Sequence, residues 1–104
     1  MLIPKTYAKF PDRPTAVKAF ASLAEALVRQ YELRCPDPTA EQYKYILEKL
    51  TNLPKNAVSI DLTYGFVDCA IYALRHHPKP SEISENLLAQ FVANKHEHNT
   101  DDDY

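Results

Sequence analysis

The chain has 104 residues and a mass of 11.9 kDa, a length that predicts one domain. Apolar residues make up 45% of the sequence and charged residues 25%, which is typical of a folded globular protein and excludes a chain that is disordered throughout. The single glycine, Gly65, excludes the glycine-rich loops that bind phosphates and dinucleotides, because such loops need several glycines.

Residues 1–14 begin the chain with Pro4, Pro11 and Pro14, and each proline favours extended backbone in the residue before it. We therefore predict an irregular N-terminal arm over residues 1–14. Residues 1–20 hold four basic residues and one acidic residue, so the arm is either simply solvated or contacts an acidic partner.

The first helix is predicted over residues 15–33, with Thr15 as its N-cap. Its apolar residues recur at helical spacing on one face, namely Phe20, Leu23, Ala24, Leu27 and Tyr31. A second helix is predicted over residues 40–51, where Thr39 and Gln42 have the spacing of a capping box.

Residues 58–62 alternate between apolar and polar side chains, as a short strand does. A lone strand has no mate, so we instead predict a third helix over residues 59–77, capped by Ser59 or Asp61. This helix is the most apolar of the four, which predicts a central position. A fourth helix is predicted from Glu82 to about His96, capped by Ser81.

The predicted fold class is therefore all-α, a compact bundle of about four antiparallel helices. The bundle domain covers residues 15–97, and residues 98–104 form a disordered acidic tail. Residues 95–104 contain one basic and four acidic residues, and we interpret this end as solvated.

The cysteines and the apolar runs indicate the cellular compartment of the protein. Cys35 and Cys69 are too few for a disulfide framework and form no CxxC pair, so we expect both to be reduced and the protein to be cytoplasmic. The N-terminus has no apolar core of a signal peptide, and the longest wholly apolar run, residues 69–74, is far too short to span a bilayer. We expect no membrane partner.

The histidines do not form a metal-binding pattern. His76 and His77 are adjacent and His96 and His98 are two apart, whereas two ligands on one helix face need a spacing of three or four. Cys69 lies two turns before His76, which is too far for a shared ion without help from another segment. The sequence therefore predicts no catalytic residues, no cofactor and no metal site.

Four polar residues interrupt the third predicted helix along one stripe: Tyr64, Asp68, Tyr72 and Arg75. They form either a polar seam between helices or a protein-binding face, since tyrosine and arginine often anchor interfaces. In the first case Asp68 accepts a hydrogen bond from a tyrosine and Arg75 pairs with an acid on a neighbouring helix. We predict these four as the protein-binding residues.

A second candidate surface combines basic and aromatic residues that could contact phosphates and stack on bases. It consists of Lys5, Tyr7, Lys9, Arg13, Lys18, Lys44, Tyr45 and Lys49. The net charge of −2 and the isoelectric point near 6.0 exclude a polycationic nucleic-acid binder, so any such contact is local.

The sequence thus predicts a non-enzymatic accessory subunit that acts through contacts with one or more proteins of a larger assembly. One alternative is a nucleic-acid-contacting subunit of a ribonucleoprotein or DNA-processing complex. A second is a small metal-binding protein or enzyme that uses the histidines. Self-association is left open.

Overall fold

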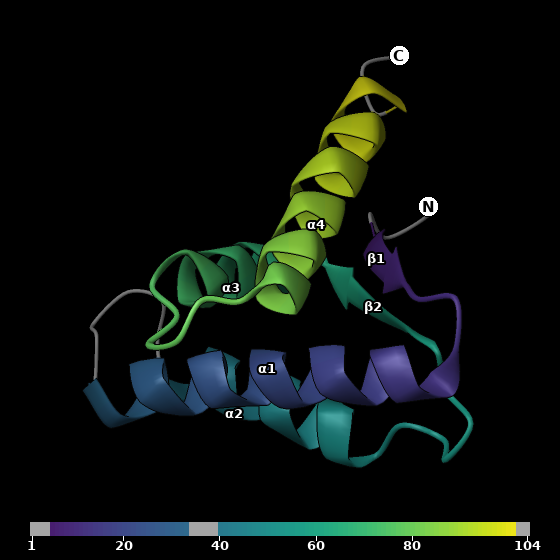
Figure 1. Ribbon diagram of the computed structural model, residues 1–104. Helices are drawn as coiled ribbons and strands as arrows, with labels where there is room; N and C mark the ends of the chain where they lie inside the picture. Colours follow the sequence, from purple (N-terminus) through teal and green to yellow (C-terminus); the bar gives the residue numbers. More distant parts are fainter. Residues whose placement is uncertain (1–4, 34–39, 102–104) are drawn as a thin grey trace.

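The structure, a computed structural model, describes residues 5–33 and 40–101, apart from the side chains of Lys5, Ala40, Tyr64 and residues 96–101. Six elements follow one another: β1 (Lys5–Lys9), α1 (Arg13–Leu33), α2 (Ala40–Thr51), β2 (Ser59–Thr63), α3 (Tyr64–Arg75) and α4 (Glu82–Asp101). Figure 1 shows α1 and α2 side by side, with α4 rising beside the two strands. The fold is mostly helical and compact, with a radius of gyration of 13.2 Å.

The two strands form an antiparallel sheet that the sequence reading missed. Thr6 pairs with Leu62 and Ala8 pairs with Ile60, and all four side chains are buried on one face. The alternation in residues 58–62 was therefore a true strand signal, and assigning these residues to a helix was wrong. The mate of β2 lies in the segment expected to be an irregular arm, and that expectation is wrong for Lys5–Lys9.

Side chains of α4 cover the outer edge of β1. The backbone N–H of Lys9 donates to the Gln90 side-chain oxygen at 2.8 Å, and the Asn94 amide donates to the Tyr7 carbonyl. The opposite edge of β1 pairs with β2, so the backbone of this strand is bonded on both sides. Because of these bonds, β1 is a built-in part of the fold and does not present a free strand edge.

The ends of the helices differ from the predictions at three places. Asp12, and not Thr15, caps α1: its carboxylate oxygen accepts from the Thr15 N–H at 2.8 Å. Pro14 fits the first turn because that turn has no partners for its N–H groups. The third helix begins at Tyr64, directly after β2, with Thr63 at the N-cap. At its far end α4 continues to Asp101, past the expected end near His96.

The Ser81 cap of α4 is confirmed. The Ser84 N–H donates to the Ser81 side chain at 3.3 Å, and the Ser81 N–H donates to the Ser84 hydroxyl oxygen at 2.8 Å. This reciprocal pair satisfies two backbone donors in the manner of a capping box. The prediction of a disordered tail is wrong for residues 98–101, which continue α4, and residues 102–104 lie outside the described residues. The other predicted capping box includes Thr39, which also lies outside them.

The expectation that the third helix is central is confirmed, because α3 packs against every other helix and both strands. The core combines residues from all elements, and its largest fully buried side chains include Leu23, Leu27, Tyr43, Ile46 and Phe91. The prediction that Tyr31 lies on the buried face of α1 is wrong, because its side chain is 43% exposed.

The Asp12 cap leads to a prediction about pH. The hydrogen bond from the Thr15 backbone N–H, followed by one from its side chain, lowers the pKa of Asp12 below its usual value of 3.8. A lowered folded-state pKa contributes stability above the unfolded-state value, and this contribution is lost as the pH falls through the folded-state pKa. The Asp12→Asn variant keeps a capping side chain but has no charge.

We therefore expect the native protein to unfold at a higher temperature than Asp12→Asn at pH 7. The two midpoints should converge as the pH falls from about 5 to about 2, the range in which an aspartate titrates. Thermal unfolding followed by circular dichroism measures both midpoints. A difference that stays constant over this range would show that the charge of Asp12 has no part in the cap.

Candidate functional site

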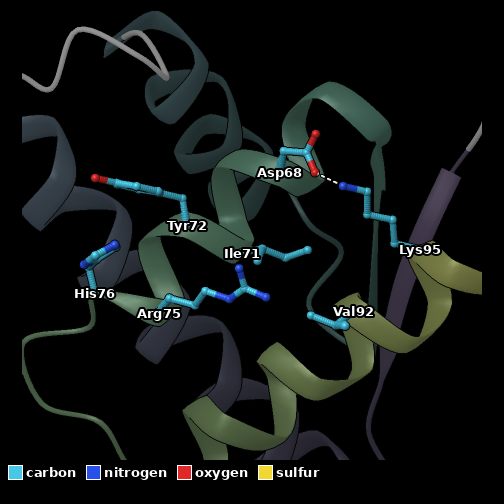
Figure 2. Close-up of a pocket in the computed structure, with 7 residues that line it drawn as sticks. All are labelled: Asp68, Ile71, Tyr72, Arg75, His76, Val92 and Lys95. Atoms are coloured by element: carbon cyan, nitrogen blue, oxygen red, sulfur yellow. Dashed lines mark hydrogen bonds and ion pairs between the residues drawn. The ribbon is translucent and has the colours of Figure 1, made fainter.

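A groove between α3 and α4 brings together three of the four predicted protein-binding residues. Its volume is about 540 Å³. We call it the α3–α4 groove and define it by the residues that line it: Asp68, Ile71, Tyr72, Arg75, His76, Val92 and Lys95. Figure 2 shows Ile71 and Arg75 reaching from α3 toward α4.

The inner part of the groove is apolar. Ile71 is 8% exposed and Val92 of α4 is half-buried, and both belong to or pack against the main core. At the outer rim the rings of Tyr72 and His76 pack against each other, with centroids 4.4 Å apart and a tilt of 42°. The groove thus offers an apolar floor with an aromatic wall, a composition common at the centre of protein interfaces.

One end of the groove is closed by an ion pair between Asp68 of α3 and Lys95 of α4 (Figure 2). The polar-seam interpretation expected Asp68 to accept a hydrogen bond from a tyrosine hydroxyl. The structure instead pairs Asp68 with a lysine. The Asp68 side chain is 56% exposed, so solvent screens the pair and its contribution to stability is small. Its effect is to fix the two side chains across the groove.

Arg75 differs from the other charged residues of the groove. Within the described part of the chain its guanidinium has no ion pair and no hydrogen bond, and the side chain is exposed. The expectation that Arg75 pairs with an acid on a neighbouring helix is therefore wrong for the described residues. Because Lys95 is paired with Asp68, the positive charge of Arg75, beside the apolar floor, is the one in the groove without a partner among the described residues.

The fourth predicted residue, Tyr64, begins α3, and its side chain lies outside the described part of the structure. Gly65, next to it, is exposed, and an added Cβ would meet no atom within 4 Å.

The groove also includes residues that the sequence did not predict as site residues. His76 follows Tyr72 by four residues at the end of α3, so the helical repeat places it beside the stripe. Val92 and Lys95 join the groove only because α4 packs against α3, and no local pattern in the sequence marks that contact.

The candidate nucleic-acid residues do not share one site. Lys9 and Lys18 line a pocket of about 550 Å³ between the start of α1 and α4, which also contains the acidic Glu82. Tyr45 and Lys49 line a different, small pocket beside β2.

The other members of that set are scattered. Tyr7 is exposed on β1, Lys44 is exposed on α2, and the side chain of Lys5 lies outside the description. Arg13 donates to the Ala57 carbonyl, so its guanidinium holds the loop before β2. The ring of Tyr45 stacks on Phe66 with centroids 4.2 Å apart, which leaves one ring face at most for a base.

His76 and His77 have different environments although they are neighbours. His76 is exposed at the end of α3. His77 is buried: its Nδ1 accepts from the Lys79 N–H at 2.9 Å, so its Nε2 carries the proton and donates to the Ser22 carbonyl at 3.1 Å. His77 therefore ties α1 to the α3–α4 connection.

Cys69 is buried in α3, where its thiol bonds to the Gly65 carbonyl at 3.5 Å, and Cys35 lies outside the described residues. Among the residues that the structure describes, no three His, Cys, Asp or Glu side chains are grouped so that they could hold a metal ion. None of the helices described is both long enough and apolar enough to cross a membrane.

Comparison of the chain with protein-family models, with curated proteins and with solved structures found no match.

Proposed function

We propose that this protein is a non-enzymatic interaction subunit that binds a segment of a partner protein in the α3–α4 groove. The observation that carries the proposal is the charge of Arg75, which has no partner in the part of the chain that the structure describes, next to the apolar floor formed by Ile71 and Val92. Tyrosine and arginine are enriched among the residues that dominate binding at the centre of protein interfaces.

The groove favours a partner segment with two neighbouring features. An apolar side chain fits over Ile71 and Val92, where its burial removes apolar surface from water. A carboxylate next to it meets the Arg75 guanidinium, which can donate two parallel hydrogen bonds to such a group. The Tyr72 ring, 36% exposed, adds contact area at a low entropic cost.

The N-terminal segment has a smaller part in this function than the sequence suggested. A free arm could lie along a partner surface, but β1 is bonded to β2 on one edge and to α4 on the other. The proposal therefore rests on the groove alone.

The groove is tested by two variants that change binding and leave the fold in place, Tyr72→Ala and Arg75→Gln. We expect each to weaken partner binding by about tenfold or more, which corresponds to about 1.4 kcal/mol. Both side chains are exposed, so the unfolding free energy should change by less than about 1 kcal/mol. Matched controls are Tyr7→Ala on β1 and Lys55→Gln in the loop before β2, both exposed and outside the groove.

The partner is first captured from the native cell with the wild-type chain, with nuclease-treated and mock-treated extracts compared. Affinity for the identified protein is then measured for all variants. Loss with both groove variants and retention with both controls supports the proposal. Equal affinity for wild type and groove variants would place the contact elsewhere on the molecule.

Salt dependence separates this function from the nucleic-acid alternative. A contact made mainly by apolar surface and one arginine weakens little with added salt, whereas neutralising several phosphates gives a steep decrease. Capture that disappears after nuclease treatment, together with a steep salt response, would favour the alternative and direct attention to Lys9 and Lys18, which line one pocket.

A further inference from the structure

A second surface, independent of the α3–α4 groove, lies on the outer face of α1. The structure exposes seven large hydrophobic side chains among the residues that it describes, and four of them are on this helix. They are Val17, Val28, Tyr31 and Leu33, with exposed fractions between 42% and 53%. By the helical repeat the first three lie on one side of α1, whereas Leu33 lies on another side at the end of the helix. A soluble helix normally keeps such residues on its inner face, so this concentration marks a surface suited to a partner.

The exposed apolar residues follow a regular spacing. Val17, Ala21, Ala24 and Val28 are separated by four, three and four residues, which is the spacing of the apolar seam in paired helices. We call these four residues the α1 seam. Ala21 is exposed and Ala24 is half-buried, and both line a shallow pocket together with Val28. Small residues at the middle of a seam let two helix backbones approach closely.

The order of residues in the seam is the same in both directions: valine, alanine, alanine, valine. A helix that docks antiparallel to α1, with the two-fold axis between Ala21 and Ala24, therefore finds its own sequence complementary. Ala21 packs on Ala24 of the second copy, and Val17 packs on Val28 of the second copy. Such self-complementarity is the requirement for an interface formed by the same patch on both subunits.

The charges beside the seam select the same arrangement. Lys18 and Glu25 lie on one flank of the seam, and both are exposed. In the antiparallel pair Lys18 faces Glu25 of the second copy, and the symmetry makes this contact twice. In a parallel pair the two-fold axis places the same flank of the two copies on opposite sides of the seam, so Lys18 and Glu25 would not meet.

From these observations we infer that the protein self-associates as an antiparallel dimer through the α1 seam. The interface contains four apolar layers and two ion pairs, which is at the small end of specific interfaces, so the dimer is weak and concentration-dependent. The groove between α3 and α4 takes no part in it, and each copy keeps its groove residues. The dimer then presents two grooves to a partner, which raises avidity for a partner with repeated segments.

Analytical ultracentrifugation of the full chain tests the dimer, over a range from about 1 μM to 1 mM, where weak interfaces are populated. We expect the wild type to shift from monomer to dimer within this range. Ala21→Arg places a large charged side chain in the seam and should remain monomeric throughout. The control, Ala89→Arg, makes the same change at an exposed position of α4 and should dimerise as the wild type does.

A charge exchange tests the antiparallel arrangement directly. Lys18→Glu and Glu25→Lys each place like charges opposite one another, and each alone should weaken the dimer by about tenfold. An equimolar mixture of the two variants restores both attractive pairs, so mixed dimers should form with the wild-type affinity. Thermal unfolding of each variant verifies that it is folded, since Glu25 also lies 3.9 Å from the His77 ring.

Three outcomes would overturn the inference. The first is a wild-type chain that stays monomeric up to about 1 mM. The second is an Ala21→Arg variant that dimerises as well as the wild type. The third is a mixture of the charge variants that associates no better than either alone. A dimer disrupted by Tyr72→Ala and not by Ala21→Arg would place self-association in the α3–α4 groove and contradict the seam.

Discussion

Replacing Phe91 with alanine should lower the unfolding free energy by about 3–5 kcal/mol, the usual cost of deleting a fully buried phenylalanine. Phe91 is 0% exposed and lies on α4, the helix that packs against α3, α1 and β1. The loss has two parts, the apolar surface that returns to water and the cavity that neighbouring side chains fill only partly. A protein of this size has a total stability of roughly 5–15 kcal/mol, so this one change removes a large fraction of it.

Urea unfolding at 25 °C measures the Phe91→Ala effect. The control is Leu33→Ala, which truncates a large apolar side chain that is 53% exposed, and its expected effect is within about 0.5 kcal/mol. If the two variants were equally stable, α4 would not be anchored by Phe91, and the groove that it forms with α3 would have no fixed geometry.

The second large effect is expected at His77. Its side chain is 2% exposed and bonds to the Ser22 carbonyl, the Ser22 hydroxyl and the Lys79 N–H. His77→Ala removes these partly buried bonds and leaves a gap where the buried ring lay, which should cost about 2–3 kcal/mol of unfolding free energy. The neighbouring His76 is exposed, so His76→Ala serves as a matched control with a change below about 1 kcal/mol.

Urea unfolding of the two histidine variants compares adjacent residues of the same type. We expect the unfolding free energy of His76→Ala to exceed that of His77→Ala by at least about 1 kcal/mol. A reversed order would mean that the His77 bridge between α1 and the α3–α4 connection does not form.

The helices of this fold were predictable from the sequence, whereas the sheet was not. Apolar residues such as Leu23 and Leu27 repeat at helical spacing, and the prolines near residues 36–38 and 78–80 separate the helices. Ile60 and Leu62 carry the strand signal of β2, but no neighbouring segment of the sequence offers a second strand to pair with it. That mate, β1, lies more than fifty residues earlier, and pairings over such distances leave no local pattern.

In the candidate site, too, one part was predictable from the sequence and the other was not. Asp68, Tyr72 and Arg75 share one face of α3 because of the helical repeat, so their stripe could be predicted. The other wall of the groove, Val92 and Lys95, depends on how α4 packs, and the pairing of Asp68 with Lys95 follows from that packing. Tyr31 was placed inside by its spacing, yet the fold leaves it exposed because the elements around α1 cover only part of that helix.

The central claim, a protein-binding groove between α3 and α4, is tested most directly by comparing two free energies for Tyr72→Ala. One is the loss of affinity for the captured partner, and the other is the loss of unfolding free energy of the isolated chain. We predict an affinity loss of at least about 1.4 kcal/mol with an unfolding change clearly smaller than this. Equal losses would show that Tyr72 is part of the core, and an unchanged affinity would show that the partner binds elsewhere.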